Sequence, residues 1–489
     1  VQSSSDTNTG NDRTYLQDEV NQLITEINRI SGNTEFNSTK LLDGTFTDKN
    51  IQIGTASNQV LRLGVASTDS TKLGAYQVDT VDESIGRVNS FASATTAMNA
   101  LFSDSADYVI KGTFGTYTAM VDAGADARDV ASSFNLLSGD TGVNATALSK
   151  ARLSASAVAT YSFTLQGKSS TTSQITATIT SVTDLTAIKD AINAVSGSTG
   201  ITAALTSDKS GINITQSEGF DIIIGDLSTG STNADLHVTS MDMDGVLDTT
   251  EVTVDLSSPP GSAAGASITA TAHGFSVGDI VTYTSTSAMT GLTSGSSYKV
   301  KAVANANTFT LETTASAAVT YGGGGGTAND TFTRTARALD GDATTGDSTA
   351  ISGVVRLSSQ NAYTVSPGHA DNIFSSGTTE ITASHNTISG ISLTTKAGAT
   401  KAMSIIDGAL LMISGIRSDM GSANNRLQST IDNLSNIAVN AQKSLSTIED
   451  ANFAEETARL TKAQILAKAA TSMLAQANKA KETMLALLQ

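Results

Sequence analysis

Apolar residues near the start of the chain recur every three or four positions, which is the period of one face of an α-helix. The pattern predicts a helix from about residue 10 to residue 32, with Asn11 or Asp12 as its N-cap and Gly32 as its end. The residues predicted to form the apolar face of this amphipathic helix are Leu16, Val20, Leu23, Ile24, Ile27 and Ile30.

A tight β-hairpin is predicted directly after this helix. Lys40-Leu41-Leu42 and the alternating Ile51-Gln52-Ile53 flank Asp43-Gly44. This dipeptide supplies the positive φ angles that a two-residue hairpin turn requires.

From about residue 80 to residue 395 the period changes to two. Short runs such as 161–165 and 175–179 alternate polar with β-branched or aromatic residues, and this alternation predicts strands. Residues 134–143 recur 58 positions later as residues 192–201, so we predict two copies of a small α+β module, each closing a short helix. In the second copy, the helix is predicted to bury Leu185, Ile188, Ile192 and Val195 and to end at Gly197.

A different block covers residues 266–314, which show four strand-like runs and no helical period. Pro259-Pro260 precedes it and five consecutive glycines, 322–326, follow it. Both are typical of hinges, so the block is interpreted as an inserted β module.

The chain from about residue 400 onward follows a seven-residue apolar period over six heptads, which is typical of a coiled-coil seam. The period breaks at residues 449–451, and a second helix is predicted to start with Asn452 as N-cap and Glu455 completing a capping box. This last helix continues to the end of the chain with a seam made mainly of Ala. The positions predicted to pack in the coiled coil are Ile406, Ile413, Ile416, Met420, Leu427, Leu434 and Ile448.

Composition excludes several classes of function. The 489 residues include 29 Lys and Arg against 46 Asp and Glu, a net charge of −17, which argues against binding the phosphate backbone of nucleic acids. With no Cys and only four widely spaced His, we expect no disulfide, thiol nucleophile, cofactor or metal site. No continuous apolar run approaches the roughly 20 residues needed to cross a bilayer, so no membrane span is predicted.

Three motifs invite a chemical interpretation, and each has a simpler structural one. Residues 274–278 fit the G-x-S-x-G nucleophile pattern beside His273, but the following residues alternate like a strand where that motif needs a helix, so a turn is favoured. The acidic run 449–456 is explained by its position at a helix start, where carboxylates are stabilised and Glu455 can pair with Arg459. No Lys-Ser or Lys-Thr follows the glycine run, so a phosphate-binding loop is not supported and no catalytic residue is predicted.

The C-terminal seam carries more apolar surface than this chain can cover by itself. It extends over roughly 85 residues, and the only other substantial predicted helix is the short one near residue 20. Apolar surface of this extent is buried in an assembly, so the seam is interpreted as a signal for self-association.

Sequence motifs at both ends resemble those of bacterial flagellins. At the C-terminal end these are residues 417–426, 433–436, 448–450, 453–457, 460–466 and 473–478, and at the N-terminal end residues 16–23, Arg29, 34–37, 40–44 and 51–54. The repeat at residues 155–226 resembles the insertion motif of flagellins and hook-associated proteins. The resemblance covers about 75 residues at the front and 85 at the back, which is the division expected of constant ends around a variable middle.

This resemblance implies an α+β fold with long coiled-coil helices from the conserved ends and a β-rich, multi-module variable region between them. The expected divisions are the N-terminal segment 1–78, the first repeat copy 79–150, the insertion-motif module 151–228, the inserted β module 262–316, the return β segment 317–395, the coiled-coil helix 396–450 and the inner-core helix 451–489.

The implied function is that of a structural subunit of the flagellar filament, not an enzyme, exported through the flagellar type III channel and located outside the cell. Implied partners are further copies of the chain, an export chaperone, the filament cap and hook-associated proteins. The vertebrate flagellin-sensing toll-like receptor is a further implied partner, with Glu19 in the receptor-facing region. The residues expected in the inner core of the filament are Phe453, Leu460, Leu474, Leu485 and Leu488.

Two alternatives stay open, a hook-filament junction protein and a surface adhesin that binds through the β-rich middle. The family's opening helical arm has no counterpart at the start of this sequence, so we expect that arm to be missing. Lys479-Ala480-Lys481 and Ala470 stand where the family usually has Pro and Gly, which favours an uninterrupted last helix.

Overall fold

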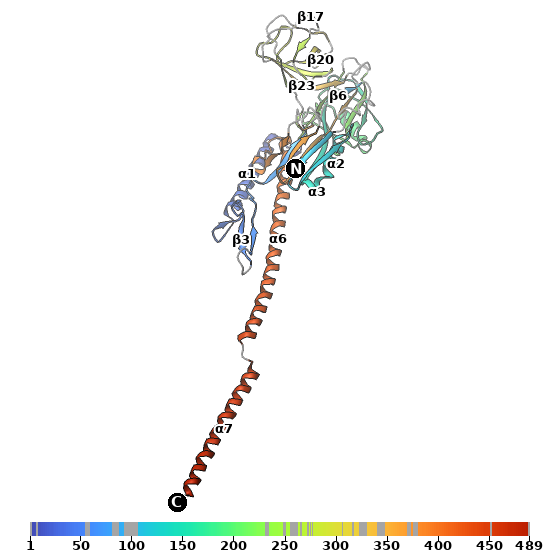
Figure 1. The fold of residues 1–489 in the computed structure, drawn as a ribbon. Helices are drawn as coiled ribbons and strands as arrows, with labels where there is room; N and C mark the ends of the chain where they lie inside the picture. Colours follow the sequence, from blue (N-terminus) through green and yellow to red (C-terminus); the bar gives the residue numbers. More distant parts are fainter. Residues whose placement is uncertain are drawn as a thin grey trace. The chain divides into compact units, whose positions relative to one another are not determined.

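The fold is known from a computed structural model and combines long helices at the chain ends with a β-rich middle, as α+β proteins do (Figure 1). Its residues fall into two units, one made of Val1–Thr45 and Ala66–Gly415 and the other of Phe46–Val65 and Ile416–Gln489. The structure describes residues 2–5, 8–53, 59–80, 88–91, 106–229, 234–247, 251–254, 263–264, 267–270, 273, 275, 277–305, 307–314, 317–321, 330–339, 348–368, 373–374, 380–449 and 452–487.

Helix α1 (Gly10–Asn33) confirms the predicted N-terminal helix, with different ends. Its N-cap is Thr9, and Asp12 is the third helical residue of a reciprocal capping box, in which the Asp12 N–H donates to Thr9 Oγ1 (3.3 Å) and the Thr9 N–H donates to Asp12 Oδ2 (2.9 Å). The predicted caps Asn11 and Asp12 were therefore wrong by two or three positions. The helix also passes through Gly32, because a glycine without a left-handed backbone does not by itself end a helix.

The predicted hairpin at Asp43-Gly44 is wrong. A short hairpin forms earlier, between β1 (Glu35–Phe36) and β2 (Thr39–Lys40), and its turn residues Asn37 and Ser38 have φ angles of 48° and 60°. Asp43 instead accepts the Thr45 N–H at 2.9 Å, a local turn within a bend. The strand predicted near Ile51 is β3 (Lys49–Gln52), and it pairs with β4 (Val60–Leu63) in the second unit.

Two copies of the predicted α+β module are present, with the same order of elements. The second copy contains β10 (Thr160–Gln166), β11 (Ser173–Thr178), α4 (Thr186–Ala194), α5 (Ser196–Thr199), β12 (Ile201–Leu205), β13 (Ile212–Gln216) and β14 (Ile222–Ser228). The first copy contains β7 (Ala106–Lys111), β8 (Thr116–Val121), α2 (Ala127–Asn135), α3 (Ser138–Thr141), the first half of β9 (Val143–Ala155), β25 (Val354–Ser359) and β26 (Thr364–Pro367).

Strand pairing shows that the second copy is nested inside the first. In the second copy β12 pairs with β13 and β10 with β14, whereas in the first copy β9 pairs with β25 and β7 with β26. The first copy is therefore interrupted after Leu148 and resumes at Val354, and it extends well beyond its expected range of residues 79–150. The segment that leaves the first copy lies close to the segment that returns to it, because a Cβ on Gly353 would be 2.5 Å from Ser149 Oγ.

An asparagine fixes the helix end against the following strand in both copies. Asn193 donates to the Ala203 carbonyl (2.9 Å) and accepts the Ala203 N–H (2.8 Å). Asn135 likewise donates to the Ala145 carbonyl (2.9 Å) and accepts the Ala145 N–H (2.8 Å). The helical segment ends at a left-handed glycine, Gly200 in the second copy, so the predicted end at Gly197 was wrong by three residues.

Each module has its own apolar core. In the second copy the core contains Leu185, Ile188 and Ile192 of the predicted stripe, and Val195 packs against it half-buried. In the first copy the core is centred on Tyr108, Phe134 and Phe374, whose rings contact one another.

The inserted β module is also present, with the four predicted strands β18 (Ile268–Thr269), β19 (Asp279–Thr284), β20 (Ser297–Asn305) and β21 (Thr308–Thr313) around a separate core. Pro259-Pro260 and the glycine run lie outside the described residues. The remaining strands are β5 (Gly74–Asp79), β6 (Val88–Phe91), β15 (Leu236–Ser240), β16 (Glu251–Val254), β17 (Ala263–Ala264), β22 (Thr320–Tyr321), β23 (Asp330–Leu339), β24 (Ser348–Ile351), β27 (Ile381–Thr382) and β28 (Ser384–Thr387).

One large sheet joins the inserted module to the repeat modules. Its main strand order is β18-β21-β20-β19-β23-β15-β9-β25-β5-β28, so the long strand β9 belongs to both copies of the repeat and pairs with β15 toward the inserted module. Two short 3-10 helices, η1 (Gln2–Ser4) and η3 (Ile388–Gly390), lie near the ends of the first unit's sequence, before α6 (Lys396–Glu449) and α7 (Phe453–Ala486) complete the chain.

Candidate assembly surface

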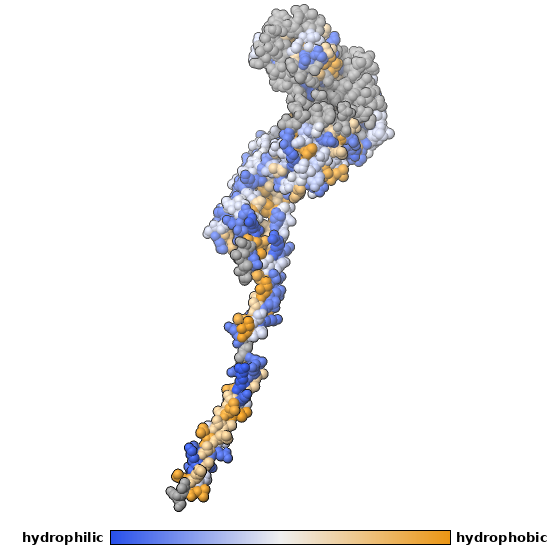
Figure 2. Space-filling view, in the orientation of Figure 1, coloured by the Kyte–Doolittle hydropathy of each residue, from blue (hydrophilic) through white to orange (hydrophobic). Residues whose placement is uncertain are grey.

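Helix α7 exposes apolar side chains along its whole described length. None of its residues is buried, and Figure 2 shows hydrophobic and hydrophilic groups interspersed from end to end. A helix that is apolar on several sides, without one polar face, is stable in water only when other helices surround it. The exposed large apolar side chains of α7 are Phe453, Leu460, Ile465, Leu466, Met473, Leu474, Met484 and Leu485.

Four of the five residues expected in the inner filament core lie in this set. Phe453, Leu460, Leu474 and Leu485 are all exposed, while Leu488 lies outside the described residues. We name the exposed apolar side chains of α7, together with those of α6 from Ile416 onward, the terminal apolar surface.

The predicted seam of α6 is present as a row of positions on one helix. Ile416, Leu427 and Leu434 are half-buried by neighbouring side chains, and Met420 and Ile448 are exposed. Steps of three, four and seven along this row keep the residues on one side of the helix, which is the geometry that a partner helix needs.

The first part of α6 packs within the first unit. Ala402, Ile405 and Ala409 are buried there, and Ile413 packs against the same cluster together with Val20, Ile24 and Ile27 of α1. At this end the apolar row shifts by one residue, because Ile405 is 4% exposed and the predicted Ile406 is 41% exposed.

Close approach of α6 to strand β5 requires a glycine. A Cβ at Gly408 would lie 2.5 Å from the Ala75 Cβ and 3.0 Å from the Gly74 carbonyl oxygen. In the middle of a helix a glycine costs about 1 kcal/mol relative to alanine, so its presence here is explained by this contact.

A buried arginine joins β25, β5 and the turn after β15, and no motif in the sequence predicts it. Arg356 donates to both oxygens of Asp79 (2.6 and 2.7 Å) and to both oxygens of Asp244 (3.0 Å each). Ser404 of α6 lies 3.4 Å from the Arg356 Nη1 and accepts a hydrogen bond from Gln77. The ion pairs of Arg356 thus join separate segments of the β-rich region, and Ser404 links the start of α6 to them.

The start of α7 agrees with the predicted cap position but not with its bonding. Asn452 is the N-cap, yet its side chain makes no capping hydrogen bond, so the predicted capping box is wrong. Glu455 does accept from Arg459 at 2.8 Å, as predicted for residues four positions apart.

The G-x-S-x-G match has no nucleophile geometry in the described residues. Strand β19 follows it, as predicted, and His273 is buried in the inserted module, accepting the Phe275 N–H at 3.0 Å and contacting the rings of Phe275 and Phe309. Ser276 lies outside the described residues. Within the described ranges, no three His, Asp or Glu side chains are grouped so as to hold a metal ion.

Length and composition alone would allow one helical window within Lys396–Ala486 to cross a membrane. That window is 28% buried. The absence of a membrane span therefore stays a prediction. Glu19, the residue expected to face the receptor, is exposed on α1.

Long helices near both ends and a nested β-rich region between them in the sequence define an α+β protein with helical ends and an inserted β-rich region. Comparison with known families narrows this class. The bacterial flagellin N-terminal helical region matches residues 1–47, the bacterial flagellin C-terminal helical region matches residues 403–488, and the flagellin hook IN motif matches residues 162–218. Both ends of the chain and this motif are therefore similar to those of bacterial flagellins.

Curated relatives show the same similarity. The chain is 37% identical over 160 residues to the B-type flagellin of Pseudomonas aeruginosa, a match that covers 32% of each chain. It is 46% identical over 103 residues to flagellin A of Vibrio cholerae, covering 21% of this chain and 27% of that one. The chain thus spans about a third or less of the length of these relatives.

Among solved structures, FliC from Burkholderia pseudomallei aligns over 87% of this chain and 89% of its own, at 14% identity and a TM-score of 0.25. The α+β assignment rests on the chain's own helices and sheets.

Proposed function

We propose that this chain is a structural subunit of the bacterial flagellar filament. The observation that carries the proposal is the terminal apolar surface, because a helix of 34 residues without one buried side chain must be covered by other helices. That surface lies within the segment that matches the flagellin C-terminal region. Copies of one chain arranged with helical symmetry supply such helices.

The same proposal assigns the chain a location and assigns separate roles to its helical and β-rich parts. The helical ends form the wall of an extracellular filament, and the nested β-rich region faces outward. The chain is a building unit and not an enzyme. Coiled-coil packing falls to Ile406, Ile413, Ile416, Met420, Leu427, Leu434 and Ile448, and inner-core packing to Phe453, Leu460, Leu474, Leu485 and Leu488.

The similarity to bacterial flagellins supports further partners as proposals. These are an export chaperone, the filament cap, the hook-associated proteins and the flagellin-sensing toll-like receptor. For the receptor, the exposed Glu19 is the residue to test, by replacing it with Ala and measuring receptor signalling at a fixed monomer concentration. Unchanged signalling would remove Glu19 from that contact.

A polymerisation assay tests the filament proposal. Leu474→Glu places a charge on α7 where the side chain is 63% exposed in the monomer, and Val158→Glu makes the same change at a site 58% exposed in the second repeat copy. Each purified full chain is added to filament seeds, and growth is measured by electron microscopy.

We expect Leu474→Glu to abolish growth and Val158→Glu to leave it unchanged, with both monomers keeping the parent's helical circular dichroism. Equal growth of the two variants would contradict the proposal, since a charge buried between helices without a partner is strongly unfavourable.

A further inference from the structure

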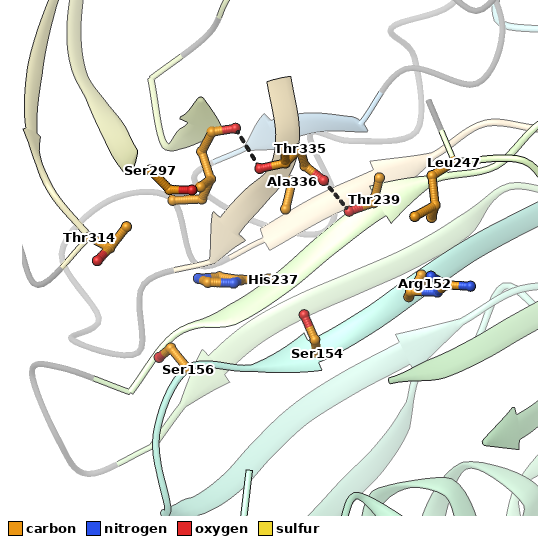
Figure 3. Close-up of a pocket in the computed structure, with 11 residues that line it drawn as sticks. Arg152, Ser154, Ser156, His237, Thr239, Leu247, Ser297, Thr314, Thr335 and Ala336 are labelled. Atoms are coloured by element: carbon orange, nitrogen blue, oxygen red, sulfur yellow. Dashed lines mark hydrogen bonds between the residues drawn. The ribbon is translucent and has the colours of Figure 1, made fainter. Parts of the chain in front are cut away.

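A polar cavity lies on one face of the large sheet, where the inserted module meets the repeat modules. Its volume is about 530 Å³, within the range of pockets that hold small molecules. Side chains from neighbouring strands β9, β15, β23, β19 and β20 line it (Figure 3). None of these residues belongs to the terminal apolar surface, so filament assembly does not account for the cavity.

Arg152 is the cationic group of this cavity. Its Nε donates to the amide oxygen of Asn213 at 3.0 Å, and among the described residues no carboxylate forms an ion pair with its guanidinium. A half-buried arginine bonded only to a neutral amide is unusual in a chain of net charge −17. The remaining guanidinium donors suit a carboxylate, which they can bind through two parallel hydrogen bonds.

Hydroxyl groups follow Arg152 along the cavity. Ser154 follows Arg152 on the same face of β9, and Ser156 comes directly after the end of that strand, so the row from Arg152 to Ser156 spans about 13 Å. Facing this row, Thr239 donates to the Thr335 carbonyl (2.8 Å) and Thr335 donates to the Ile280 carbonyl (3.2 Å). Each of the two hydroxyl groups already donates its proton to a backbone carbonyl, so toward a ligand its oxygen acts as an acceptor.

His237 lies between the two ends of this row (Figure 3). Burial and the nearby Lys299 lower the pKa of His237 to about 4, so its ring is neutral at pH 7 and offers one donor and one acceptor. Lys299 itself is 3.7 Å from Asp235, so its charge is shared with a carboxylate. Among the described residues that line the cavity, Arg152 therefore supplies one positive charge that no carboxylate balances.

These groups together define the ligand chemistry. A carboxylate is needed at the Arg152 end, and hydroxyl donors are needed along the threonine side. Sulfate offers acceptors only and carries more charge than one arginine balances. We propose that this cavity binds a sugar acid, a hexose-sized ring that carries one carboxylate and several hydroxyls.

Titration of the full-length chain with glucuronate, followed by calorimetry, tests this proposal. Glucose serves as the ligand without the carboxylate, and sulfate as the anion without the hydroxyls. We expect glucuronate to bind, and both controls to bind at least about tenfold more weakly, since each lacks one half of the recognised chemistry. Equal binding of sulfate or of glucose, or no binding of glucuronate, would overturn the proposal.

Three variants locate the binding. Arg152→Gln removes the charge, Ser154→Phe fills the cavity from the middle of the row, and Arg62→Gln changes an exposed arginine of the β3–β4 hairpin as a control. We expect the first two to lose glucuronate binding and the control to keep it. If Arg152→Gln fails to fold, Ser154→Phe decides, and retained binding in a folded Ser154→Phe chain would contradict the site.

The source of the sugar acid is distinguished by a second titration with a glucuronate-terminated oligosaccharide. Tighter binding of the oligosaccharide than of the monosaccharide identifies a glycan end as the ligand, and weaker binding identifies the free acid. Filament growth is measured on the same variants, and unchanged growth separates this cavity from the assembly function.

Discussion

Gly408 and Ala75 hold α6 and β5 so close that a Cβ on the glycine would lie 2.5 Å from the Ala75 Cβ. Gly408→Ala is therefore expected to lower the free energy of unfolding by about 1–3 kcal/mol, because the contact is overpacked by more than the alanine gains in helix propensity. Chemical denaturation of the monomer measures this change.

Gly421 of the same helix is the matched control, since a Cβ there meets nothing within 4 Å. Gly421→Ala is expected to stabilise the monomer by up to about 1 kcal/mol. A Gly408→Ala chain that is as stable as Gly421→Ala would show that α6 does not approach β5 as described.

Asn193 is predicted to be a main determinant of the second repeat copy. Asn193→Ala removes both hydrogen bonds to Ala203 and leaves two backbone groups without partners, which is expected to cost about 1–3 kcal/mol. Asn135→Ala should cost a similar amount in the first copy. Asn144, an exposed strand residue, is the control, and its replacement by Ala should change the midpoint of thermal unfolding little.

Arg356→Gln is expected to destabilise the monomer strongly, by about 3–5 kcal/mol, because it leaves the Asp244 carboxylate, which is only 11% exposed, without its cation. Asp79 is more exposed and is stabilised by water, so Asp79→Asn should cost less than Asp244→Asn. Urea denaturation of the three variants gives this order. A reversed order of the two aspartates would mean that Asp79 is the principal partner of Arg356.

Stability should depend on pH through Asp221. One of its carboxylate oxygens, Oδ1, is buried without a hydrogen-bond partner among the described residues. Burial raises the pKa of Asp221 to about 7, and repulsion from Asp126 and Asp129 adds to this. Because the folded state binds this proton more tightly than the unfolded state, stability from this group is present at low pH and is lost as the pH rises from about 4 to about 7.

Asp221→Asn removes this titration. The variant should unfold at a higher temperature than the parent chain at pH 7.5 and at nearly the same temperature at pH 4.5. Thermal unfolding at the two pH values gives the comparison. If the unfolding temperature of the variant differs from that of the parent by the same amount at both pH values, the effect comes from the change in side-chain packing and not from the charge of Asp221.

Periodic parts of the fold could be predicted from the sequence because periodicity is a local property. The stripe of α1, the heptads of α6 and the alternating strands of the inserted module depend on residues a few positions apart. The duplicated segment near Phe134 and Ile192 was visible for the same reason, since its helix end and following strand are encoded together.

Features that depend on distant pairing could not be predicted in this way. The nesting of one repeat copy in the other rests on the pairing of Leu148 with Val354, and nothing near either residue encodes it. The Arg356 cluster likewise joins residues 112 and 277 positions away. At Asp43-Gly44 the local signal was misleading. This dipeptide often forms a hairpin turn, but here the hairpin forms earlier in the chain, between β1 and β2.

The central claim, that this chain builds a flagellar filament with its nested β-rich region outside, is tested most directly by immunogold electron microscopy. An antibody against residues 150–390 is applied to cells that produce the chain. We predict gold label along the whole length of each filament. Label confined to one ring at the filament base, or on the cell body without filaments, would contradict the claim.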